Sequence, residues 1–73
     1  MASRGILTNR LEMFVAMIQR ERVTIRGTEQ GRLAEVTGLI NNIGVEDGSG
    51  FNLLIDMVDN VRSYRLFVKV PRC

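Results

Sequence analysis

RLAEVTGLINNIGVE, residues 32–46, is the segment from which the architecture can be inferred. Small and apolar residues first share one parity, at Ala34, Val36, Gly38 and Ile40, and then resume on the opposite parity at Ile43 and Val45. A straight strand turns alternate residues to opposite faces, so one buried face cannot include both sets. The pattern therefore predicts a long strand with a bulge or sharp bend between Asn41 and Gly44.

The segment before this strand has helical periodicity. Asn9 followed by Glu12 resembles a capping box, and Leu11, Phe14, Val15 and Ile18 recur at helical spacing. We predict a helix over residues 7–19. Met13 and Met17 widen its apolar surface; they either pack on the body of the domain or face a neighbouring molecule.

Shorter strands are expected on both sides of the bent one. Alternation begins after Glu21, a polar turn is predicted at residues 27–31, and DGSG at residues 47–50 is a hairpin signal. Apolar alternation continues over residues 51–58, a tight turn is expected at residues 59–60, and a last segment runs from residue 61 to 70. The sequence predicts a mainly-β single domain over residues 1–73: an N-terminal helix and then, over residues 22–70, a strongly bent antiparallel barrel.

The chain has 73 residues, and domains of this size bury too little surface for a large core. Its single cysteine, Cys73, cannot form a disulfide within the chain. Association with other copies or with a partner is the remaining source of stability, and we expect a homo-oligomer. No basic-then-apolar signal segment or membrane-spanning stretch is evident, which favours a cytoplasmic protein without a membrane partner.

Charge is distributed unevenly along the chain. Residues 1–32 carry +3, residues 33–61 carry −5 and residues 62–73 carry +4. Nine of the ten basic residues are arginine, whose planar guanidinium binds phosphate through two donors and stacks on bases. Basic ends around an acidic middle are compatible with nucleic-acid binding, and also with an ordinary solvated surface.

Residue types that carry catalysis are scarce. There is no histidine, and the one cysteine is the last residue, beyond the predicted strands; this removes the commonest general base, metal ligand and thiol nucleophile. The glycines of DGSG are followed by neither a helix pattern nor the lysine of a phosphate-binding loop. We expect a protein that is not an enzyme and that uses no metal or cofactor.

Several short motifs resemble the Sm-like family, which includes bacterial Hfq. The run RERV at residues 20–23 resembles the basic junction between helix and first strand in Hfq. The stretches EVTGLI at residues 35–40 and FNLLID at residues 51–56 are similar to the first Sm motif, and residues 61–71 look like the last two strands of Hfq.

This resemblance implies a five-stranded barrel related to the SH3 type, assembled as a ring of six or seven copies. In such a ring the fourth strand of one copy pairs with the fifth strand of the next. The resemblance also implies a site for single-stranded RNA rich in uridine or adenine. The residues that it assigns to RNA binding are Phe51, Asn52, Arg62, Tyr64, Arg20 and Arg22. The residue types also fit purely structural roles, in which Phe51 belongs to the core, Asn52 stabilises a turn and Arg62 is a solvated surface residue.

Two functional hypotheses follow from the sequence. The first is an Sm-like ring that binds single-stranded RNA. The second is an assembly or adaptor module, for example a small viral or accessory scaffold, that binds no nucleic acid. It is favoured by the small net charge of +2 and by Ser63 and Tyr64, which stand where Hfq has a basic residue and a histidine in its pore loop.

Overall fold

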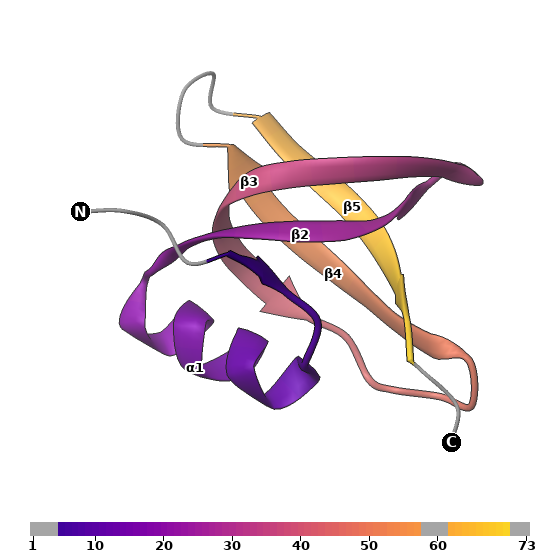
Figure 1. Ribbon diagram of the computed structural model, residues 1–73, viewed down its shortest axis with the longest axis horizontal. Helices are drawn as coiled ribbons and strands as arrows, with labels where there is room; N and C mark the ends of the chain where they lie inside the picture. The colour runs from indigo at the N-terminus through magenta and orange to yellow at the C-terminus, as the bar shows by residue number, and fades with distance from the viewer. Residues whose placement is uncertain (1–4, 58–61, 71–73) are drawn as a thin grey trace.

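A computed structural model describes residues 5–57 and 62–70 of the chain. Within them the protein is mainly β, as predicted, with a single sheet and one short helix (Figure 1). The elements in chain order are β1 (Ile6–Leu7), α1 (Arg10–Gln19), β2 (Arg22–Glu29), β3 (Arg32–Ile43), β4 (Gly50–Met57) and β5 (Arg62–Lys69). The predicted turn at residues 59–60 lies outside the described residues.

The sheet has the order β1-β2-β3-β4-β5 and is mixed. β1 pairs with β2 in parallel, whereas the other neighbouring strands are antiparallel. The prediction of a wholly antiparallel sheet is therefore wrong at β1. It failed because Leu7 was assigned to the helix, whereas Ile6 and Leu7 extend beside Thr24 and Ile25.

The C-terminal part of the sheet is the single last segment that the residue pattern predicts, and it differs only from the two strands that the resemblance implies. The segment that resembled two strands forms the single strand β5, which pairs with β4 from Arg62 to Lys69. Among the described residues four strands therefore follow the helix, and the fifth strand of the sheet precedes it. The pairing of β5 with β4 is regular from Arg62 to Lys69, so no break separates β5 into two strands.

The helix begins three residues later than predicted, but its cap is the predicted one. The Asn9 side chain accepts a hydrogen bond from the Glu12 backbone N–H at 3.2 Å. At the other end Arg20 adopts a left-handed conformation, with φ of 54°, and its N–H donates to Met17 at 3.2 Å. These caps limit α1 to ten residues.

The face of α1 that packs on the sheet is not the predicted stripe. Met13 and Ala16 are completely buried, which confirms the packing role for Met13. Leu11, Val15 and Ile18, by contrast, are exposed. Hydrophobic periodicity could not identify the packed side, because both sides of this helix carry apolar residues. Which side is buried depends on how α1 packs against β3.

The predicted bend in the long strand is confirmed. β3 pairs with β2 from Arg32 to Leu39 and with β4 from Leu39 to Ile43, with a register shift between Ile40 and Asn42. The extra residue lets Ile40 and Ile43 both face the core despite their opposite parity. Val45, predicted to continue this face, is instead 89% exposed because it lies in the loop after β3.

The loop between β3 and β4 contains the predicted hairpin turn. Asp47 Oδ1 accepts hydrogen bonds from the Ser49 N–H at 2.8 Å and the Gly50 N–H at 3.0 Å. It also accepts from the Ser49 hydroxyl at 2.9 Å. These bonds lower the pKa of Asp47 from its ordinary value, and they fix the turn locally.

The helix is joined to this loop by Arg10. The Arg10 guanidinium lies 4.9 Å from the centre of the Phe14 ring and 5.4 Å from that of Phe51. Its Nη2 donates to the Gly44 carbonyl at 2.8 Å, while its buried Nε has no hydrogen-bond partner among the described residues. Arg10 therefore ties the first turn of α1 to a segment 34 residues away.

A close crossing brings β2 and β5 together. β2 pairs with β5 at Thr28 and Phe67, and the β2–β3 hairpin crosses the β4–β5 hairpin there (Figure 1). Gly27, predicted to begin a turn, is buried inside β2, and the turn is confined to Gln30 and Gly31. A Cβ on Gly27 would lie 2.6 Å from the Phe67 carbonyl oxygen, so this crossing requires glycine.

Inward side chains of all the strands, together with α1, form one core. Fully buried members include Val23 and Ile25 of β2, Leu53 and Ile55 of β4, and Leu66 of β5.

No helix in the described part of the chain combines the length and the apolar character needed to span a membrane.

Replacing Gly27 by alanine tests the crossing. We expect Gly27→Ala to lower the free energy of unfolding by about 1–3 kcal/mol, because the new methyl group forces β2 and β5 apart. Gly48→Ala is the matched control, since a Cβ there would meet nothing within 4 Å. Urea denaturation of the three proteins measures the difference, and equal stability of both variants would contradict the close crossing.

Candidate binding surface

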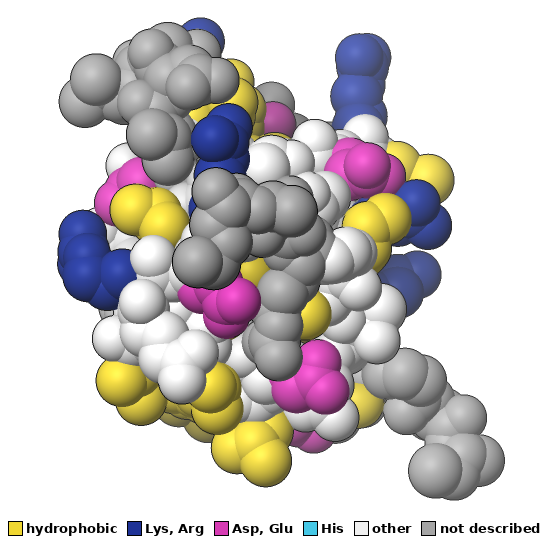
Figure 2. All heavy atoms as spheres, turned by 60° about the vertical axis from the view of Figure 1, so that its left-hand side comes forward, with side chains coloured by type: hydrophobic (Ala, Val, Ile, Leu, Met, Phe, Trp, Pro, Cys, Tyr) yellow, Lys and Arg dark blue, Asp and Glu magenta, His cyan; other side chains and the backbone are white. Residues whose placement is uncertain are grey.

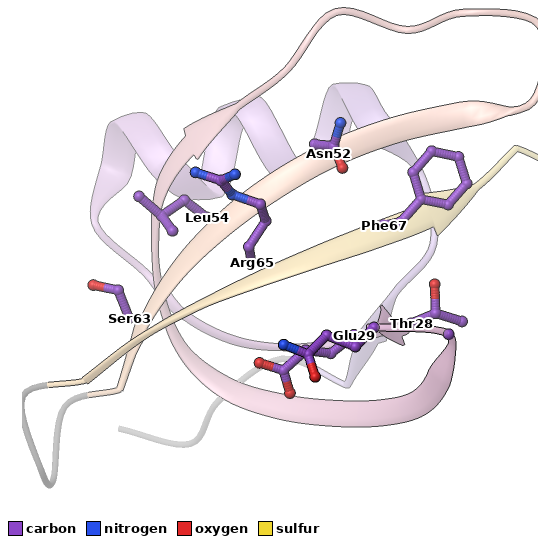
Figure 3. Close-up of a pocket in the computed structure, with 9 residues that line it drawn as sticks. Thr28, Glu29, Asn52, Leu54, Ser63, Arg65 and Phe67 are labelled. Atoms are coloured by element: carbon purple, nitrogen blue, oxygen red, sulfur yellow. The ribbon is translucent and has the colours of Figure 1, made fainter.

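A groove lies between the tip of the β2–β3 hairpin and the outer face of β4 and β5 (Figure 3). Its volume is about 570 Å³. We call it the β4–β5 groove; its lining consists of Thr28, Glu29, Gln30, Gly31, Asn52, Leu54, Ser63, Arg65 and Phe67.

Strand register explains why these residues meet. Asn52 pairs with Phe67, and Leu54 pairs with Arg65, so all four occupy the same face of the β4–β5 hairpin. Their neighbours Phe51, Leu53 and Leu66 point to the core on the opposite face. The β2–β3 hairpin supplies the other wall because its crossing at Thr28 and Phe67 carries Gln30 and Gly31 beyond β5.

The groove contains complementary polar and aromatic groups. Figure 3 shows Arg65 extending across β4, between Leu54 and Asn52. Arg65 and Asn52 are exposed, and Phe67 is partly buried. A guanidinium offers several donors, and an amide offers both donors and an acceptor, so this pair can bind a planar polar ligand or an anion.

A second hollow adjoins the groove across β4. It has a volume of about 280 Å³ and shares Asn52, Leu54 and Arg65 with the groove. Asn42 and Gly44 at the end of β3 line its far side. The two hollows together form a polar track across the sheet, with Arg65 and Asn52 at its middle.

Of the six residues assigned to RNA binding from the sequence, only Asn52 lines this groove. Phe51 is 2% exposed and lies in the core beneath Arg10, so its ring is not presented to a ligand by the single chain. Asn52 and Phe51 are adjacent in β4, and their opposite placement follows from strand alternation.

The other four residues lie beyond the end of the groove that Ser63 lines, away from Asn52 and Phe67. Arg22 pairs with Leu39, which pairs with Asp56, which in turn pairs with Ser63, so these residues form one row across β2 to β5. Arg62 follows at the start of β5, five register positions from Phe67, or about 17 Å along the strand. The predicted residues therefore do not form one site.

Arg62 and Tyr64 contact each other at this end. The Arg62 guanidinium carbon lies 5.9 Å from the centre of the Tyr64 ring, within the range of a cation–π interaction. Tyr64 is partly buried and packs against the core, whereas Arg62 is exposed.

An acidic residue, Asp56, organises the same end of the sheet. Its carboxylate accepts hydrogen bonds from the Ser63 hydroxyl at 2.6 Å and the Asn41 amide at 2.9 Å. These two bonds, with a smaller contribution from the positive charge of Arg20, hold the pKa of Asp56 below its ordinary value. Asp56 therefore joins β3, β4 and β5 beside the bulge.

Arg65 and Phe67 are two groove residues that the sequence analysis did not assign to binding. Their signal was the alternation of Ser63, Arg65, Phe67 and Lys69, which places these polar and aromatic side chains on one face of β5. This signal was not enough to predict the groove, because the β4 residues that lie beside Arg65 and Phe67 are set by the β4–β5 pairing, and no local motif specifies that pairing.

No cluster of residues that could hold a metal ion occurs in the described ranges 5–57 and 62–70.

No protein-family model, curated protein or solved structure matches this chain.

The lowered pKa of Asp56 predicts a pH-dependent stability. A carboxylate with a depressed pKa in the folded state stabilises the protein at neutral pH, and this stabilisation is lost as the pH falls through the folded pKa, below the ordinary 3.8. We expect Asp56→Asn to lower the free energy of unfolding near neutral pH, and the difference from wild type to shrink in acid.

Denaturant unfolding of both proteins between pH 7 and pH 3 measures this difference. Glu46→Gln removes the same charge from an exposed loop residue and serves as the control. A difference that stays constant over this pH range would show that the Asp56 charge does not stabilise the fold.

Proposed function

We propose that this protein binds single-stranded RNA in the β4–β5 groove. The observation that carries the proposal is the convergence of Asn52, Arg65 and Phe67 on one open groove at the outer face of the sheet. Single-stranded RNA is recognised by stacking of bases on aromatic or guanidinium planes and by hydrogen bonds to base edges. This groove offers each of these groups within one hollow.

Roles within the groove follow from side-chain chemistry. The Asn52 amide is suited to the edge of a base, while Phe67 and the Arg65 guanidinium provide planes for stacking. Arg65 also attracts the phosphate backbone. The Glu29 carboxylate repels phosphate at the hairpin wall, so we place the phosphates on the β5 side of the groove.

We further propose that the sheet is an Sm-like barrel. Two features support this proposal: the sharply bent long strand, and the β2–β5 pairing at Thr28 and Phe67 that brings an early and a late strand together. In this proposal the motif resemblance at residues 20–23, 35–40 and 51–56 reflects a common architecture.

A ring of six or seven copies is part of the same proposal. From Arg62 to Leu66, β5 has no partner strand on the side away from β4 among the described residues. An open edge of this kind exposes unpaired backbone groups that readily pair with another chain. We place the contact between neighbouring copies at this edge of β5.

The alternative function, an assembly or adaptor module, is favoured by one different observation. Leu11, Val15 and Ile18 present an apolar stripe to solvent on α1, away from the groove. Such a stripe serves protein contacts rather than RNA. Binding measurements on groove variants separate the two functions because they leave α1 unchanged.

Titration of labelled uridine-rich and adenine-rich oligonucleotides tests the RNA proposal. We expect Arg65→Ala and Asn52→Ala each to weaken binding by about 1–3 kcal/mol, because each loses a base contact. Arg62→Ala should have a smaller effect, since Arg62 lies at the other end of β5. Affinity should also fall as the salt concentration rises, because phosphate contacts release counterions.

Arg26→Ala is the charge-matched control. Arg26 pairs with Glu35 at 3.1 Å on the exposed face of the β2–β3 hairpin and does not line the groove. If Arg26→Ala weakens binding as much as Arg65→Ala, the attraction is only a general effect of charge. If the folded wild-type protein binds neither oligonucleotide at low salt, the RNA proposal is wrong and the assembly module is the better account.

A further inference from the structure

An apolar hollow lies beside the crossing of β2 and β5, where β1 also meets β2. Its volume is about 310 Å³. Small-molecule sites in proteins occupy about 300–1,000 Å³, so the hollow can hold a small ligand. We call it the β1 hollow; its apolar side chains are Ile6 and Leu7 of β1, Leu33 of β3, and Phe67 and Val68 of β5.

The hollow exists because β2 changes its partner along one edge. β3 occupies the whole of the other edge of β2. On the remaining edge β1 pairs at Thr24 and Ile25, and β5 pairs at Thr28. Among the described residues no strand pairs with this edge at Arg26 and Gly27, and both of these residues line the hollow.

Large apolar side chains remain exposed at this hollow. Ile6 is 40% exposed and Leu33 is 81% exposed. Leu33 pairs with Thr28, which pairs with Phe67, so these three residues form one row across β3, β2 and β5. An apolar ligand in the hollow would remove this surface from water, and its binding is favoured by the hydrophobic effect.

The lining favours a hydrocarbon chain over a peptide. Apart from two charged residues, the lining residues with hydrogen-bonding side chains are Thr8 and Thr28. A buried peptide group that loses its water without gaining hydrogen bonds costs free energy. A hydrocarbon chain has no such groups and incurs no such cost.

Two cations also line the hollow. Two residues along each strand from the Thr28–Phe67 pair lie Arg26 on β2 and Lys69 on β5. The Arg26 guanidinium has a partner, because its Nη2 lies 3.1 Å from the Glu35 carboxylate. Within residues 5–57 and 62–70 no ion pair involves Lys69. One positive charge beside the hollow is therefore left for the anionic group of a ligand.

The attraction for an anion is local. On the face of the molecule that Figure 2 shows, basic and acidic side chains are interspersed and form no large field of one sign. Salt screens exposed charges beyond about 10 Å, so an anionic group gains attraction only close to Lys69. A single ammonium group matches a single negative charge, such as a carboxylate.

We propose that the β1 hollow binds an aliphatic monocarboxylate. Its hydrocarbon chain lies among Ile6, Leu33 and Phe67, and its carboxylate lies beside Lys69. The hollow shares Thr28 and Phe67 with the β4–β5 groove, but its other lining residues are distinct. The inference goes beyond the proposed function and does not depend on RNA binding.

Titration of the full-length protein with octanoate, in the absence of RNA, provides the first test. Calorimetry measures the affinity, and amide chemical shifts locate the ligand. We expect saturable shifts at Gly27 and Val68, which line the hollow, and none at Val15 on α1. Octylammonium has the same chain with the opposite charge, and we expect it to bind about fivefold more weakly than octanoate.

Substitution of Lys69 tests recognition of the carboxylate. Lys69→Gln should weaken octanoate binding about fivefold, because the ion pair is lost, and should leave the binding of uncharged octanol unchanged. Arg32→Gln is the charge-matched control, since Arg32 is exposed and does not line the hollow. If Arg32→Gln weakens octanoate binding as much as Lys69→Gln, the proposed carboxylate site is wrong.

Substitution of Leu33 tests the position of the chain. Leu33→Gln should weaken the binding of octanoate and octanol alike, because both lose an apolar contact. Val45→Gln is the matched control, since Val45 is 89% exposed in the loop after β3 and does not line the hollow. Equal effects of the two substitutions would show that the chain binds elsewhere, and would overturn the proposal.

A second copy of the chain is the other occupant that the experiment can detect. Light scattering of wild type and Leu33→Gln should give the same mass if the hollow is a ligand site. If octanoate produces no saturable shifts, the proposal is wrong. A lower mass for Leu33→Gln would then assign the hollow to contact between copies.

Discussion

The bend in β3 between Ile40 and Asn42 is the constraint on which the other elements depend. The first half of β3 pairs with β2 and the second half with β4, so this bend sets the angle between the two hairpins. That angle lets Phe67 meet Thr28 and places the hairpin tip opposite the outer face of β4 and β5. The core and the groove are consequences of the same extra residue.

Strand alternation then divides neighbouring residues between stability and binding. Phe51 enters the core, whereas Asn52 enters the groove; Leu66 is buried, whereas Arg65 is exposed. A one-residue slip between β4 and β5 would exchange these roles on both faces. The surface that we propose for RNA is therefore as strongly specified as the core, because the same register holds both.

The features that could be predicted from the sequence are those that local chemistry specifies. The Asn9 cap, the Asp47 turn and the bulge after Ile40 each depend on residues close together in the chain. Predicting the groove would have required the register between β4 and β5, which pairs residues distant in the sequence and which no sequence motif specifies. The packed side of α1 was also unpredictable, because Leu11 and Met13 are equally suited to a core by composition alone.

The contact between Arg10 and Gly44 has a consequence for the order of folding. Residues 10–19 contain their own cap and can become helical early, but Arg10 has no carbonyl to bind until the β3–β4 loop is in place. This bond joins residues 34 positions apart, so we expect it to form only after the β3–β4 loop has reached the helix. For α1 to leave the sheet, this hydrogen bond must break and the guanidinium must separate from the Phe51 ring, whereas Phe14 lies on the same helix and would move with Arg10.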